Sequence, residues 1–178
     1  MNETKKLEFR KLKAAEIECR IGTISEKGLS LLLYKDARVD MSLLDETVGP
    51  MNWKREHTRE NRNCIVSIWD SEKKEWISKE DTGTESNTEA EKGLASDSFK
   101  RACVNWGIGR ELYTAPFIWV KAEDCNITNF GGKTRCNDKF VVVKITYKKN
   151  GDIDGLAIKN TKTRELVFTQ MPTEKEDK

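Results

Sequence analysis

The sequence has few of the side chains that build metal sites. His57 is the only histidine among 178 residues, and the five cysteines show no CxxC spacing. Cys125 and Cys136 flank a Gly-Gly loop and could approach each other, but a structural zinc site takes four ligands. Scattered cysteines in odd number are typical of reduced thiols. We therefore expect no metal and no cofactor.

The sequence also lacks long apolar runs and a strong excess of one charge. No stretch of about 18 apolar residues could span a membrane, and the N-terminal MNETKKLEFRK lacks the apolar core of a signal peptide. These absences predict a cytoplasmic protein without a membrane partner, in the bacterial host cytoplasm if the gene is phage-encoded. Lys and Arg (32) nearly balance Asp and Glu (30), so nucleic-acid binding would require a local patch of cations.

Motifs for catalysis are incomplete. Gly132-Lys133-Thr134 resembles the end of a phosphate-binding loop, but the glycine required five residues earlier is Ile127, so we reject an ATP site. Glu80, Asp81 and Glu85 could hold Mg²⁺ in a nuclease, or form an acidic helix entry favoured by the helix dipole. No nucleophile stands with a base and an orienting group. We expect a non-catalytic binding protein, with a metal-dependent nuclease and a structural RNA-binding oligomer as alternatives.

The segment 87–109 carries the clearest helical pattern. Its apolar positions recur at three- and four-residue steps, which predicts one buried face of a helix. Thr88 with Glu91 fits a capping box, and Gly107 suits the exit. The apolar positions are Leu94, Ala95, Phe99, Ala102, Cys103 and Trp106.

The remaining segments predict mainly strands. Residues 17–22 and 29–34 favour a first hairpin, and Asp36 begins a helical stripe that Gly49-Pro50 ends. A three-strand meander is expected over 53–82. Asn150-Gly151 indicates a hairpin between 140–147 and 153–158, with a short strand at 165–169.

These elements predict an α+β fold. It consists of an antiparallel β-meander sheet backed by a long central helix (a β-β-β-α core), with an N-terminal helix and a C-terminal β-hairpin. We expect one domain over residues 1–171, with a core at 7–113 and a C-terminal hairpin region at 117–171. Residues 172–178 read as a disordered charged tail.

Cations on the central helix could contact phosphates. Lys92 and Lys100 lie two turns apart on one face, beside Arg101, and each turn of about 6 Å is close to the phosphate spacing of a single strand. Arg20 lies on a predicted early strand. Aromatic residues that could stack on bases, although a core position is the simpler interpretation for most, are Tyr34, Trp53, Trp69 and Trp76.

Four segments resemble the single-strand DNA annealing proteins of the Rad-fifty-two superfamily, in particular phage Sak recombinases and bacterial DdrA proteins. The last is the most specific, because its string is long and ungapped. The four are AEIECRIG (15–22), YKDARVDMSLLDETVGPMNW (34–53), WISKEDTGTES (76–86) and EKGLASDSFKRACVNWGIGRELY (91–113). The resemblance runs from about Leu7 to Tyr113, and we find little family signal after Phe117.

The resemblance implies an ATP-independent recombinase that pairs complementary strands in recombination and repair. It implies a homo-oligomeric ring or filament with the ssDNA backbone in a positively charged groove. Arg20, Lys92, Lys100 and Arg101 match DNA-contacting cations of the family. Val104 departs from the pattern, because eukaryotic members have a basic residue there. Further candidate partners are duplex DNA at a second site and a single-strand-binding protein or exonuclease.

Overall fold

Contacts within the chain group its residues into two compact units. The structure is a computed structural model that describes residues 6–84 and 90–173. One unit comprises 1–11 and 37–110, and the other comprises 12–36 and 111–178. The second unit therefore combines the early hairpin, which we predicted as part of the core, with the C-terminal strands.

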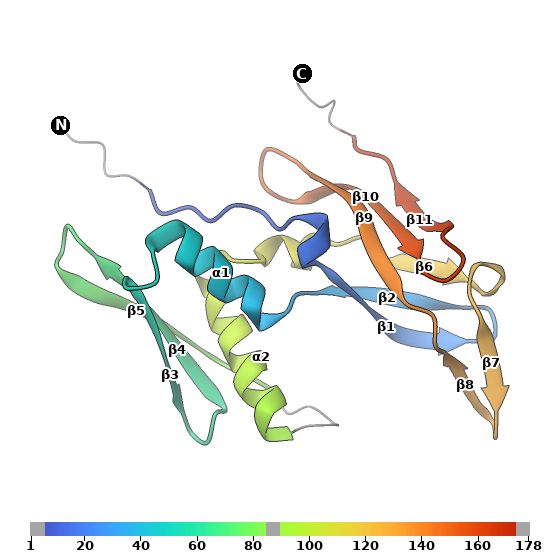
Figure 1. The fold of residues 1–178 in the computed structure, drawn as a ribbon, viewed down its shortest axis with the longest axis horizontal. Helices are drawn as coiled ribbons and strands as arrows, with labels where there is room; N and C mark the ends of the chain where they lie inside the picture. The colour runs from blue at the N-terminus through green and yellow to red at the C-terminus, as the bar shows by residue number, and fades with distance from the viewer. Residues whose placement is uncertain (1–5, 85–89, 174–178) are drawn as a thin grey trace. The chain divides into compact units, whose positions relative to one another are not determined.

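The first unit contains a three-stranded antiparallel sheet and two helices (Figure 1). The strands follow one another in the order β3-β4-β5, and α2 packs on β4 and β5. The elements are α1 (Ala37–Val48), β3 (Trp53–Thr58), β4 (Asn63–Asp70), β5 (Glu75–Thr82) and α2 (Ala90–Asn105).

Alternation along β4 decides which face of this sheet carries the core. Cys64, Val66 and Ile68 are buried on one face, because successive side chains of a strand point to opposite sides. Phe99 of α2 is fully buried and stacks on Trp53 of β3, with ring centroids 6.2 Å apart. The apolar face predicted for the helix is thus the face that meets the sheet.

Two glycines fix how α2 is joined to its neighbours. Gly107 follows the helix with φ = 101°, a left-handed conformation that only glycine adopts readily. At Gly83, where β5 ends, a Cβ atom would lie 2.6 Å from the backbone nitrogen of Ser98. The strand exit therefore approaches the helix backbone more closely than any larger residue allows.

The second unit contains a six-stranded antiparallel sheet in the order β11-β10-β9-β1-β2-β6 and a separate two-stranded hairpin. Buried aliphatic side chains such as Leu29, Val120 and Ile158 form its core. Its strands are β1 (Glu18–Ser25), β2 (Gly28–Tyr34), β6 (Ile118–Lys121), β7 (Ile127–Phe130), β8 (Lys133–Cys136), β9 (Phe140–Tyr147), β10 (Ile153–Asn160) and β11 (Leu166–Gln170). Single 3₁₀ turns are η1 (Ala14–Glu16), η2 (Arg110–Thr114, whose first residue belongs to the first unit) and η3 (Ala122–Asp124).

The α+β class and the antiparallel strands are confirmed, but two expectations differ from the structure. The N-terminal helix is wrong for residues 6–13, which are not helical. Only the short turn η1 forms there, closed by a hydrogen bond from the Lys13 amide to Glu16. The strands also divide among three sheets. Residues 174–178 of the expected tail lie outside the described residues. Thr173, at the start of that tail, donates hydrogen bonds to buried Asp154.

Candidate nucleic-acid interface

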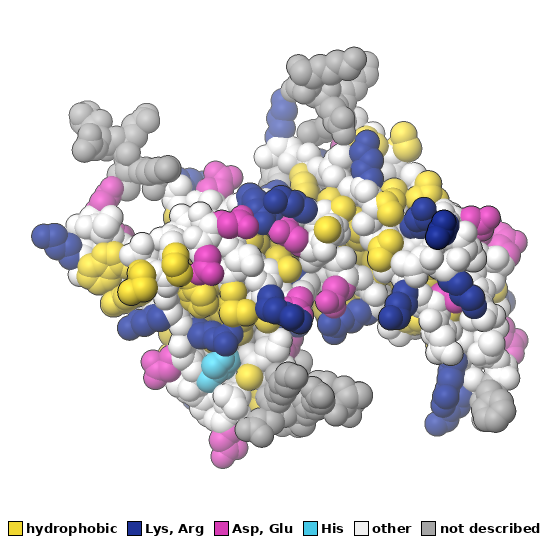
Figure 2. Space-filling model, viewed as in Figure 1, with side chains coloured by type: hydrophobic (Ala, Val, Ile, Leu, Met, Phe, Trp, Pro, Cys, Tyr) yellow, Lys and Arg dark blue, Asp and Glu magenta, His cyan; other side chains and the backbone are white. Residues whose placement is uncertain are grey.

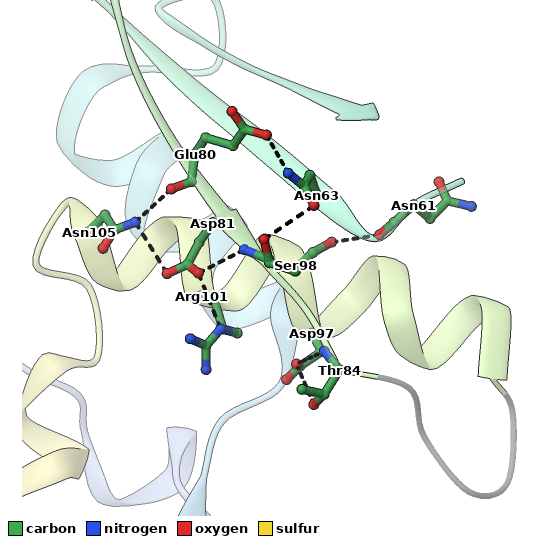
Figure 3. Close-up of polar contacts among 10 residues, drawn as sticks. Asn61, Asn63, Glu80, Asp81, Thr84, Asp97, Ser98, Arg101 and Asn105 are labelled. Carbon is green, nitrogen blue, oxygen red and sulfur yellow. Dashed lines mark hydrogen bonds and ion pairs between the residues drawn. The ribbon is translucent and has the colours of Figure 1, made fainter. Parts of the chain in front are cut away.

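Arg101 lies on the surface of α2 beside the edge strand β5. Its Nε is 3.4 Å from Oδ1 of Asp81, and 45% of its side chain is exposed. Asn105, one turn further along, donates to the same carboxylate at 3.3 Å and to the Glu80 carbonyl at 3.0 Å (Figure 3). Among residues 6–84 and 90–173, Asp81 is therefore the one carboxylate paired with Arg101, and the exposed guanidinium can reach a further anion.

Lys100 precedes Arg101 and is half-buried. Within residues 6–84 and 90–173 its ammonium forms no hydrogen bond or ion pair with another side chain. Lys92 lies in the first turns of α2, but its side chain is outside the part of the structure that is described. The backbone of α2 thus carries three of the four predicted contacts, two of which have described side chains.

Arg20, the fourth predicted contact, belongs to the second unit. It lies on β1, where Nη2 is 2.9 Å from Glu18 and the guanidinium lies 4.8 Å from the centre of the Tyr34 ring. The structure therefore gathers three of the predicted cations on one helix and places Arg20 on a strand of the other unit. Tyr34 is exposed and supports the guanidinium through a cation–π contact.

Two further cations, not predicted from the sequence, converge on the C-terminal end of α2. Lys79 Nζ donates to the Asn105 carbonyl at 2.8 Å and lies 4.5 Å from the Trp106 ring centre. Arg110 donates to the carbonyl of Val104 at 2.9 Å and to that of Asn105 at 3.2 Å. Cations at this end satisfy free carbonyls and oppose the helix dipole. Arg110 brings positive charge to the turn of α2 that contains Val104.

Sequence features could have indicated both cations. Lys79 lies two residues before Asp81 on a strand, so the two side chains share the face that meets α2. Arg110 follows Gly107 and Gly109, both with positive φ, and these turns return the chain toward the helix end. The helical pattern of α2 alone does not show these two contacts, because Lys79 lies on β5 and Arg110 lies beyond the end of the helix.

The middle of α2 is held by uncharged and acidic groups. Thr84 donates its amide hydrogen to Asp97 at 2.9 Å (Figure 3). The Ser98 hydroxyl lies 3.0 Å from the Asn61 carbonyl and 3.5 Å from Nδ1 of His57. Burial, and then the positive charge of Arg55, lower the pKa of His57. These bonds fix the orientation of α2 relative to the β3–β4 turn.

The carboxylates considered for a nuclease have other partners. Glu80 accepts a hydrogen bond from Asn63 at 2.6 Å, while Asp81 faces Arg101 and Asn105. As neighbours on a strand, Glu80 and Asp81 point to opposite faces of the sheet. Glu85 lies outside the described residues. In the part of the chain that is described, no group of three or more His, Cys, Asp or Glu side chains is placed to hold a metal ion.

One comparison with known proteins assigns part of this chain to a family. Residues 70–129 match the model of the Rad52/22 family double-strand break repair protein. The match includes only the last residue of β4, together with all of β5 and α2 and the cations at the end of α2. It supports membership of the Rad-fifty-two superfamily, as the resemblance predicted. No curated protein and no solved structure matches the chain.

No helix in residues 6–84 or 90–173 is long and apolar enough to cross a membrane. Cys125 and Cys136, considered for zinc, are free thiols, and burial is the main cause that raises the pKa of Cys125 to about 11.

Proposed function

We propose that the protein is an ATP-independent single-strand DNA annealing protein that holds the phosphate backbone of ssDNA in a homo-oligomer. The observation that carries this proposal is the pair Lys100 and Arg101 on α2, inside the family-matched segment. Lys100 has no ion-pair partner among the described residues, and Arg101 shares a single carboxylate with Asn105. Lys92 and Arg20 complete the proposed contact set.

The physical requirements of annealing agree with this arrangement. Base pairing supplies the free energy, so the protein needs no nucleotide hydrolysis. Its task is to hold a strand by its phosphates and leave the bases free to pair. A net charge of +2 gives one protomer little general attraction for DNA. Repeated sites around an oligomer bind one strand together, and this avidity compensates for weak individual contacts.

A combined annealing and size measurement tests the proposal. We expect the purified protein to accelerate pairing of two complementary fluorescent oligonucleotides without ATP or divalent metal, and to elute as an oligomer in the same buffer. Acceleration should fall as salt rises, because phosphate contacts release counterions. Absence of acceleration together with equal affinity for RNA would favour the structural RNA-binding oligomer. Degradation of labelled ssDNA with Mg²⁺ or Mn²⁺ would favour the nuclease.

Asp81→Asn should strengthen ssDNA binding. The carboxylate competes with phosphate for Arg101, and exposed ion pairs are worth about 0.2–1 kcal/mol. We therefore expect an affinity gain of roughly 1.5- to 5-fold at low salt, measured by fluorescence anisotropy of a labelled oligonucleotide.

Glu80→Gln is the matched control for Asp81→Asn. It removes an equal charge from the adjacent residue, whose side chain points to the other face of the sheet. Affinity should stay unchanged in this variant. Equal gains in both variants would show a general charge effect and would argue against a direct role of Arg101.

A further inference from the structure

Two tryptophans lie opposite each other on the face of the β3-β4-β5 sheet that does not meet α2. Trp69 of β4 pairs with Trp76 of β5, and their rings are 5.4 Å apart at 63°. Both indoles are partly exposed, at 36% and 38%. Ile68, which immediately precedes Trp69 on β4, and Val66, two positions before Ile68, point instead into the core against α2.

The surroundings of this tryptophan pair are polar and contain several cations. Lys54 of β3 places its ammonium 4.6 Å from the Trp76 ring centre. Next along the sheet, Ser67 and Ser78 share a hydrogen bond of 2.9 Å. The turn that joins β4 to β5 carries Lys73 and Lys74. Figure 2 shows hydrophobic side chains exposed at the left, beside the place of this turn in Figure 1, with Lys or Arg side chains around them.

The size of this surface limits what can cover it. Full burial of an aromatic side chain removes about 150–250 Å² from water, so two tryptophans that are 36% and 38% exposed offer roughly 50–90 Å² each. A stable protein–protein interface takes about 800 Å² from each partner. The exposed area is thus too small for a subunit interface by itself and matches one or two stacked rings.

We propose that Trp69 and Trp76 form a base-stacking site for unpaired nucleobases, separate from the phosphate contacts of α2. Indole rings stack on every base, and such stacking is tolerant of sequence. Lys54, which now lies over Trp76, is close enough to exchange its cation–π contact for a phosphate of the same strand. The tryptophan pair and α2 lie on opposite faces of the β3-β4-β5 sheet. A DNA strand held by its bases at the tryptophans therefore does not occupy the α2 surface.

This inference rests on the proposed function, and its test uses the full-length protein with two probes of equal length. One probe is an oligothymidylate, and the other has the same backbone without bases. In Trp69→Leu/Trp76→Leu we expect affinity for oligothymidylate to fall by about 5- to 150-fold per stacked base. Affinity for the abasic strand should not change. The oligothymidylate should also quench tryptophan fluorescence of the unaltered protein more than the abasic strand does.

Trp119→Leu is the matched control, because this indole is also 36% exposed and stacks on another aromatic ring, Phe117. It lies in the other unit and should leave both affinities unchanged. Trp76→Phe should retain part of the affinity, because phenylalanine still stacks.

Three outcomes would overturn the inference. Unchanged binding of oligothymidylate by the folded double-leucine variant would exclude the site. Equal loss for both probes would show that the tryptophans act through phosphate contacts or through folding. A fall in oligomer size would instead identify an interface between copies. If the unaltered protein binds neither probe, the proposed function itself is wrong. This outcome differs from the three above, in which the protein still binds DNA but the tryptophans are not a stacking site.

Discussion

Replacing Lys100 and Arg101 with alanine is expected to abolish ssDNA binding while the fold and the oligomer persist. Hydrogen bonds to charged groups are worth about 1.5–3 kcal/mol each, so the loss of two phosphate contacts weakens each protomer by roughly 100-fold or more. The slope of log K against log salt should fall by about 0.7 for each lost contact. Anisotropy titrations with a labelled oligonucleotide at several salt concentrations measure both quantities.

Stability should change little in this double variant. Arg101 is lost from an exposed ion pair with Asp81, which contributes less than about 1 kcal/mol, and alanine is a strong helix former. Lys148→Ala/Lys149→Ala removes the same charge from the β9–β10 turn in the other unit and should bind ssDNA normally. Undiminished binding by a folded Lys100→Ala/Arg101→Ala protein would remove α2 from the binding site.

Local patterns in the sequence located the elements around α2 well. The three strands β3, β4 and β5 lie within 53–82, where a three-strand meander was predicted, and buried Phe99 and Cys103 lie on the expected helix face. These elements bury a regular apolar stripe, so their position depends on neighbours only a few residues away. The pattern could not show that Asp81 faces Arg101, because this contact joins residues twenty positions apart.

Regions without an apolar period were predicted less well. The β7–β8 hairpin has only polar residues at Thr128, Asn129, Thr134 and Arg135, so no alternation marks it, although Gly131 and Gly132 both take positive φ in its turn. The N-terminal helix was expected from Leu7, Leu12 and Ile17, but a spacing of five residues does not repeat on one helix face. In the structure Leu12 and Ile17 are buried without a helix, and Leu7 is exposed.

The exposure of Trp69 and Trp76 could not be predicted from the sequence. A tryptophan on a strand is most simply a core residue, and the sequence offered no way to tell the two faces of the meander apart at these positions. The structure separates them, because Trp53 packs on Phe99 whereas Trp69 and Trp76 contact each other on the far face. Which aromatic rings are accessible to a base depends on which face α2 covers.

Phe99→Ala is expected to cost the first unit most of its stability. The ring is fully buried between the sheet and α2, stacks on Trp53 at an interplanar angle of 24°, and carries the guanidinium of Arg55 at 4.8 Å. Removal of a buried phenyl group typically lowers the free energy of unfolding by about 3–5 kcal/mol, against a total of about 5–15 kcal/mol for a domain. Denaturant titration followed by tryptophan fluorescence measures the loss.

Phe117→Ala provides the control, because this ring is 76% exposed and contacts only Trp119 among aromatic rings of residues 6–84 and 90–173. Its stacking accounts for about 0.5–1.5 kcal/mol at most. A comparable loss in both variants would show that Phe99 does not anchor α2. Since Phe99 immediately precedes Lys100 and Arg101, we expect its anchoring to support the proposed ssDNA binding as well. Phe99→Leu, which keeps most of the apolar volume, should therefore retain both the fold and the affinity that Phe99→Ala loses.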